Sequence, residues 1–108
     1  MKIINERDIN QVTVKGSRGE IYLKNIIASD TIVAGLRTIA PNSEVTARPH
    51  KHEDPQIAYV IKGTAMLDNG HEVLEIKTGD CIVFEPWEEH YFTSGKEEVV
   101  LFGVKWKE

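Results

Sequence analysis

The sequence contains one cysteine, Cys81, among its 108 residues, and aromatic residues make up only 7% of it. A single cysteine excludes an internal disulfide, so packing and hydrogen bonds must hold the fold. We interpret Cys81 as a buried apolar side chain rather than a catalytic nucleophile, because free cysteine is among the most often buried residue types.

Long apolar runs and basic clusters are missing as well. No stretch approaches the roughly 20 apolar residues that a membrane-spanning helix needs, and the first residues lack the apolar segment of a secretory signal. The net charge is −4, and the lysines and arginines are scattered along the chain. These features predict a cytoplasmic protein that binds neither nucleic acid nor membrane.

Helical periodicity is scarce, and short apolar runs alternate with turn residues. We predict strands over residues 12–14, 21–27, 32–40, 56–62, 64–68, 71–76, 81–84, 90–93 and 99–106. The pair Asn69-Gly70 predicts a type I′ hairpin turn, and residues 1–11 form a polar N-terminal arm. The length fits one domain, and the pattern indicates an all-β sandwich or barrel.

Potential ligands are densest between Arg48 and Gly63. His50 and His52 stand two residues apart, which places both imidazoles on one face of an extended chain. Gln56 follows at the same parity, and His90 supplies one more imidazole. Imidazole and amide ligands suit one divalent transition ion, such as Mn, Fe, Co, Ni or Zn, better than Ca or Mg.

The spacing in this stretch resembles the first of two motifs that characterise the cupin family: His-x-His, three residues, Gln, six residues, Gly. Gly79-Asp80, Pro86 and His90 resemble the second motif. The resemblance spans residues 41–94. It implies an all-β fold, a double-stranded β-helix or jelly-roll cupin barrel of the RmlC-like type, as a single domain over residues 1–108. It also implies a metal site whose ligands are His50, His52, Gln56 and His90.

Three positions depart from the family motifs. Gln56 stands where glutamate is commoner, and Ser94 replaces the closing asparagine of the second motif. Trp87 stands where the second motif has glycine, which predicts a turn that is built differently.

The glutamine carries chemical information. A divalent ion with four neutral ligands keeps a charge of +2, which makes it a stronger Lewis acid and attracts anionic oxygens. Residues 50–63 are similar to a cupin of pectin breakdown that converts unsaturated uronates to their linear keto form. We therefore expect a metal-dependent Lewis acid, an isomerase or ring-opening enzyme, with a small carboxylate or sugar-derived substrate. Two alternatives stay open: a metal-dependent dioxygenase and a non-catalytic cupin that binds a small molecule.

Other side chains are candidates for the walls of the site. Those that could contact substrate are Arg37, Arg48, Tyr59, Met66, Trp87 and Phe92, although solvated charges or core packing would explain them equally well. The candidate general bases are Tyr59, Glu53 and Glu89. His71, beside the predicted hairpin turn, is expected to be exposed.

Residue parity predicts which side chains face the barrel interior. Gln56, Ala58 and Val60 share one face, as do His90, Phe92 and Ser94, and the last strand would present Val100, Phe102, Val104 and Trp106. Ile57, Tyr59 and Ile61 would then form an apolar outer face that needs cover. Small single-domain cupins are commonly dimers, so the resemblance implies a homodimer.

Overall fold

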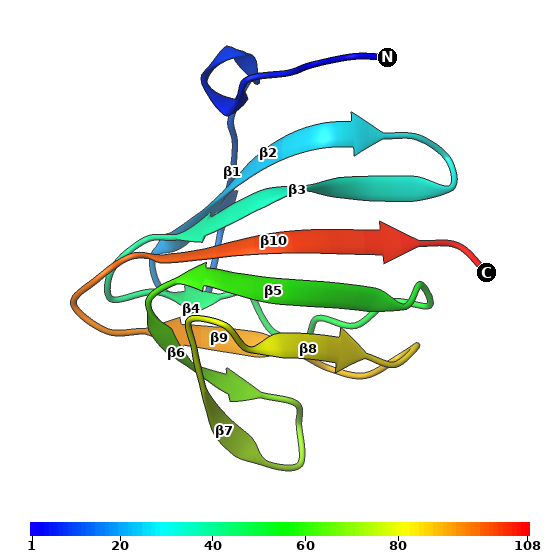
Figure 1. The fold of residues 1–108 in the computed structure, drawn as a ribbon. Helices are drawn as coiled ribbons and strands as arrows, with labels where there is room; N and C mark the ends of the chain where they lie inside the picture. Colours follow the sequence, from blue (N-terminus) through cyan, green and yellow to red (C-terminus); the bar gives the residue numbers. More distant parts are fainter.

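The computed structural model describes residues 1–108 and consists almost entirely of strands in two sheets (Figure 1). The larger sheet has the order β1 (Val12–Lys15), β2 (Glu20–Ala28), β3 (Ile32–Ile39), β10 (Val99–Trp106), β5 (Gln56–Lys62) and β8 (Cys81–Phe84). The smaller sheet has the order β4 (Glu44–Val45), β9 (Tyr91–Ser94), β6 (Thr64–Asp68) and β7 (Val73–Lys77). The predicted all-β jelly-roll barrel is confirmed.

The hydrophobic core lies between the two sheets, and strand β5 shows how alternation builds it. Ala58 and Val60 are buried, whereas Ile57, Tyr59 and Ile61 are 42%, 46% and 42% exposed. Successive side chains of a strand point to opposite faces of the sheet. The predicted inner and outer faces of this strand are therefore correct.

The last strand, β10, buries the opposite face from the one that residue parity predicted. Val99 and Leu101 are only 0% and 2% exposed, whereas Val100 and Phe102 are half-buried. Leu101 stands opposite Val60 of β5, and the register of this pair shifts between Val100 and Leu101. The prediction for β10 was wrong because both of its faces carry apolar side chains, so hydrophobic alternation does not distinguish them.

Every predicted strand is present, with ends displaced by no more than one or two residues, and the two-residue strand β4 was missed. The β6–β7 hairpin is also present, but its loop covers residues 69–72 and is longer than a type I′ turn. Asn69 Oδ1 accepts hydrogen bonds from the N–H groups of His71 and Glu72, which stabilises the longer loop. His71 is exposed, as expected.

Gly63 is the single residue between β5 and β6, where the chain passes from the larger sheet to the smaller one. Its φ is +94°, and a Cβ atom there would lie 2.8 Å from the carbonyl oxygen of Glu98. Both the left-handed backbone and the close approach favour glycine. The geometry of this corner explains why the first motif has glycine at this position.

Two features lie at the margins of the barrel. The 3-10 helix η1 (Glu6–Asp8) and the residues around it are largely exposed, and Asn5 Oδ1 accepts a hydrogen bond from the N–H of Arg7 (Figure 1). Cys81 is exposed, contrary to prediction, because it stands opposite Tyr59 on the outer face of the edge strand β8. The structure has no helix with the length and apolar character needed to cross a bilayer.

Candidate metal centre

Three imidazoles meet in the interior of the barrel. His50 and His52 come from the loop before β5, and His90 precedes β9. Candidate ligand nitrogens of the three rings lie within 4.8 Å of one another. His90 is buried, and the other two are half-buried. The fold thus brings two segments that are distant in sequence to a single point.

Backbone carbonyls orient two of these rings. Nδ1 of His52 lies 2.8 Å from the carbonyl oxygen of Asp54, and Nδ1 of His90 lies 3.1 Å from that of Glu88. A carbonyl oxygen can only accept, so each Nδ1 carries the proton and each Nε2 keeps a free lone pair. Histidines that bind metals are typically held in this way through their second nitrogen.

Gln56 extends the donor set. Its Oε1 lies 3.0 Å from Nε2 of His52. The His52 Nε2 and the Gln56 amide oxygen thus lie side by side at the edge of the histidine cluster. With the His52 proton on Nδ1, a single cation could bind both atoms. The three grouped imidazoles could hold a metal ion, with the Gln56 amide oxygen beside them.

The charge state of the histidines suits metal binding. Burial lowers the pKa of His90 to about 4, against the hydrogen bond to the Glu88 carbonyl, and repulsion from Lys105 adds to the effect of burial. Burial, together with repulsion from Lys105, also lowers the pKa of His50. Both rings are neutral at pH 7, the form in which histidine binds a metal.

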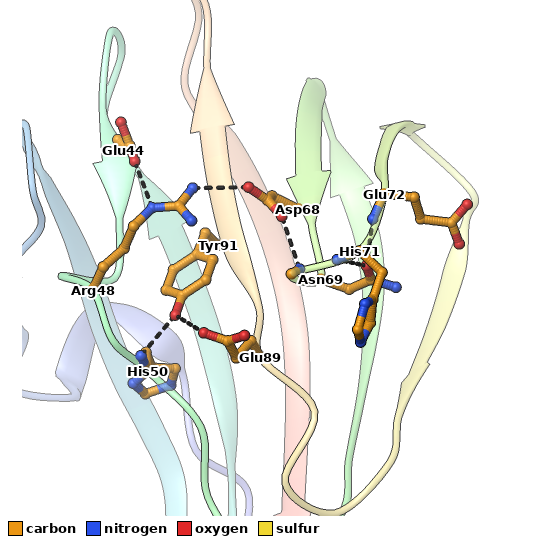
Figure 2. Close-up of polar contacts among 10 residues, drawn as sticks. Glu44, Arg48, His50, Asp68, Asn69, His71, Glu72, Glu89 and Tyr91 are labelled. Carbon is orange, nitrogen blue, oxygen red and sulfur yellow. Dashed lines mark hydrogen bonds and ion pairs between the residues drawn. The ribbon is translucent and has the colours of Figure 1, made fainter.

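Tyr91 of β9 holds the backbone at His50 (Figure 2). Its hydroxyl accepts a hydrogen bond from the His50 N–H at 2.9 Å and donates one to Glu89 at 2.8 Å. The guanidinium of Arg48 lies over the Tyr91 ring, 3.9 Å from its centroid. These contacts fix the start of the histidine stretch against the smaller sheet.

Arg48 is fully engaged on the outside of the barrel. It binds Glu44 at 3.0 Å and Asp68 at 2.9 Å, as Figure 2 shows. Hydrogen bonds to these carboxylates raise the pKa of Arg48. The pKa of Asp68 is lowered by the N–H of Gly70 and by Arg48. Arg48 thus links β4, β9 and β6 on the outside of the barrel.

A cavity of about 330 Å³ extends from the histidines into the barrel. Arg37 of β3 and Phe92 of β9, two of the predicted substrate contacts, line it. Lys105 of β10 also lines it, and sequence reasoning missed this residue. The signal was the alternation of odd-numbered residues along β10, which was assigned to the wrong face.

The other predicted substrate contacts lie elsewhere. Arg48 is in the outer network, Tyr59 is on the outer face of β5, and Met66 and Trp87 are 39% and 60% exposed. None of them lines the cavity, and neither do the candidate bases Glu53 and Glu89.

The two remaining departures from the family motifs have local explanations. Trp87 has a φ of +66°, in the left-handed region that glycine adopts most easily and a bulky residue rarely adopts. The Trp87 N–H donates to the His52 carbonyl at 2.8 Å. The buried Ser94 hydroxyl donates to the Ala40 carbonyl at 2.6 Å and accepts from the Ser43 N–H at 3.0 Å.

Known proteins share this architecture. The family model described as a cupin domain (Cupin_2) matches residues 35–104. No protein with a curated description matches the chain. Among solved structures, a predicted oxalate decarboxylase from Thermotoga maritima gives a TM-score of 0.86 at 17% identity, with 97% of this chain and 98% of that chain covered. The polyketide cyclase RemF from Streptomyces resistomycificus gives 0.84 at 22%, with 100% and 80% covered.

A third solved structure is that of KdgF from Halomonas sp., with a TM-score of 0.77 at 19% identity and coverage of 100% of this chain and 96% of that chain. At such identities the likeness extends to the fold alone.

Proposed function

This chain belongs to the cupin domain family, and on that premise we propose that it is a metal-dependent enzyme that acts as a Lewis acid on a small anionic or sugar-derived substrate. One observation carries the proposal. A set of neutral donors, from His50, His52, His90 and Gln56, adjoins a cavity whose lining contains no aspartate or glutamate.

The proposed ligands define what the site can do. A bound divalent ion would supply Lewis-acid polarisation of a substrate oxygen. The four side chains hold the ion without adding negative charge, so the site keeps a charge of +2 and attracts anionic oxygens. No anionic ligand stabilises a higher oxidation state, which favours isomerisation or ring opening over the chemistry of a dioxygenase.

Other residues of the cavity would handle protons and water. Apolar side chains such as Phe92 and Leu101 line it and keep bulk water from the bound substrate. Lys105 is the lining residue, apart from the histidines, that can move a proton. The candidate bases Tyr59, Glu53 and Glu89 lie outside the cavity.

A non-catalytic binding protein is the second candidate function. It is favoured by the lack of a carboxylate base among the residues that line the cavity. In this role the same ligands and cavity would hold a small anion without converting it. A screen of the metal-loaded protein against small carboxylates and keto-sugars separates the two functions, because only the enzyme depletes its substrate.

The substitution Gln56→Glu tests the Lewis-acid role. A carboxylate is the stronger ligand, so metal affinity should rise by about tenfold, while the site loses one unit of positive charge and turnover should fall. Gln11→Glu adds the same charge at an exposed position and serves as the matched control. Unchanged metal affinity would show that Gln56 is not a ligand. Raised turnover would replace this proposal with the dioxygenase.

A further inference from the structure

Two positively charged side chains line the cavity without an acidic partner. Neither Arg37 nor Lys105 takes part in an ion pair, and the lining contains no aspartate or glutamate. Arg37 Nη1 donates to the Leu36 carbonyl at 3.0 Å, and burial lowers the pKa of Arg37. A cation that is removed from water without a counter-charge costs free energy. This arrangement is favourable when an anion occupies the cavity.

Two buried oxygens in the same cavity also lack partners. Oδ1 of Asn25 and Oγ1 of Thr46 each expose less than 1 Å² and have no hydrogen-bond partner. Both residues line the cavity. Proteins pair nearly all of their buried polar atoms, so orphaned oxygens beside a cavity indicate a missing partner. An amide oxygen can only accept, so the partner of Asn25 must donate a hydrogen.

The strand register explains why two of these groups, Asn25 and Arg37, share one wall of the cavity. Leu23 and Asn25 of β2 stand opposite Arg37 and Gly35 of β3, so all four residues belong to the inner face. The Arg37 side chain also lies over Gly103 of β10, where an added Cβ atom would be 3.7 Å from Arg37 Cγ. The arginine side chain therefore packs against the backbone of β10 on the inner face of the sheet.

We propose that Asn25, Arg37, Thr46 and Lys105 form a recognition site for a hydroxylated carboxylate of the size of a single sugar acid. Arg37 and Lys105 bind the carboxylate, and the fork of Arg37 matches its two oxygens. Asn25 accepts a hydrogen bond from a substrate hydroxyl, and Thr46 pairs with another. The cavity is at the small end of the range for ligand pockets, about 300–1,000 Å³. The inference rests on the proposed function, in which the metal binds another part of the same substrate.

Simpler anions satisfy only part of this site. Inorganic phosphate or a dicarboxylate without hydroxyls would neutralise Arg37 and Lys105. The dicarboxylate carries no donor for Asn25 Oδ1, and phosphate carries its P–OH groups on the same atom as the oxygens that the two cations hold. A neutral sugar would pair with the two oxygens and leave both cations unpaired. A sugar acid satisfies all four side chains.

The experiment measures binding by titration calorimetry on the full chain, with and without added Mn²⁺. The probes are D-glucuronate, D-glucose, succinate and inorganic phosphate. We expect D-glucuronate to bind the Mn²⁺-loaded protein at least about tenfold more tightly than each of the other three, because each of them leaves a buried group unpaired. Equal or tighter binding of glucose, succinate or phosphate would overturn the assignment.

Two variants test individual residues. Arg37→Gln should weaken D-glucuronate binding by about 10–100-fold and leave Mn²⁺ affinity unchanged, and Arg37→Lys should restore part of the loss. Asn25→Leu should weaken D-glucuronate binding by about tenfold without affecting succinate. Lys77→Gln, on an exposed position of β7, is the control for lost charge. Circular dichroism confirms that each variant folds.

The outcomes separate this inference from the proposed function. A protein that binds Mn²⁺ but shows no preference for D-glucuronate, or whose binding is unaffected by Arg37→Gln, overturns the recognition site and keeps the metal centre. A protein that binds D-glucuronate through Arg37 but takes up no Mn²⁺ or other transition ion overturns the metal centre and keeps the recognition site.

Discussion

Arg37 and Arg48 carry the same charge in two very different surroundings. Arg48 lies outside the barrel, stacks on Tyr91 and binds two carboxylates. Arg37 lies at the wall of the cavity, forms no ion pair and donates one hydrogen bond, to the neighbouring carbonyl of Leu36. The outer arginine has all the partners it needs within the chain, whereas the inner one lacks an anion.

The groups that hold the fold and the groups that could bind a ligand lie in different parts of the molecule. The outer network fixes the backbone of the histidine stretch through Tyr91, and its charges are balanced. The cavity gathers two cations without an acidic partner and two buried oxygens without a hydrogen-bond partner, and such groups cost free energy. Such local cost is typical of functional sites, where stability is given up for ligand binding.

The largest effect should come from removing a histidine of the cavity. Structural zinc sites in small peptides are worth roughly 10–16 kcal/mol; on that scale His90→Ala, which removes one of four ligands, should weaken metal binding by about 1,000-fold. His71→Ala, in the exposed β6–β7 loop, should leave it unchanged. Calorimetric titration with Zn²⁺ and Mn²⁺ measures both. Equal affinities in the two variants would remove His90 from the metal centre.

A pH titration should reveal the buried imidazole in the metal-free protein. The pKa of His90 is about 4 in the folded state and 6.5 in the unfolded state, so the unfolded chain binds a proton first as the pH falls. This contribution to stability is complete above pH 6.5 and is lost towards pH 4. The loss should be about 3 kcal/mol in urea unfolding experiments. His90→Phe should flatten this part of the profile, and an equally steep profile would contradict the assignment.

The two arginines should respond oppositely to replacement by methionine. Arg37→Met removes a cation without a counter-charge and should raise the free energy of unfolding of the metal-free protein by about 1 kcal/mol. Arg48→Met removes two ion pairs and the contact with Tyr91, so it should lower the thermal midpoint. Thermal and urea unfolding measure both variants. If Arg37→Met proved the more destabilising of the two, Arg37 would not be a cation that lacks a counter-charge.

A smaller effect should link the outer network to the metal. Tyr91→Phe removes the acceptor of the His50 N–H and the donor to Glu89, which should lower stability by about 1 kcal/mol. Because His50 is then held less firmly, metal affinity should fall by up to about tenfold. Tyr59→Phe, on the outer face of β5, removes an exposed hydroxyl and is the control. Unchanged metal affinity in Tyr91→Phe would show that the network does not position His50.

Much of the fold could be predicted because turn residues and strand alternation are local signals. The strands from β5 to β8 were placed closely, and Gly63 marks a real corner between the sheets. The face of β10 could not be predicted, because both of its sides are apolar and only the pairing with β5 decides between them. That error concealed Lys105, since a strand that is turned over exchanges its inner and outer residues.

The candidate site was only partly accessible to sequence reasoning. The spacing of His50 and His52 is local, and the family motif linked them to His90. Asn25 and Thr46 carry no such signal, because only the three-dimensional structure shows that they are buried beside the cavity without partners. Arg37 and Arg48 could not be told apart, since their partners come from strands that are distant in the sequence. The homodimer and the cytoplasmic location stay predictions.

The most direct test of the central claim is the metal content of the chain. Elemental analysis of the protein as purified, and again after reconstitution with Mn²⁺, Fe²⁺, Co²⁺, Ni²⁺ or Zn²⁺ and removal of excess ion, counts the ions per chain. We expect about one equivalent of a transition ion, held by the three histidines and Gln56. Less than about a tenth of an equivalent after every reconstitution would contradict it.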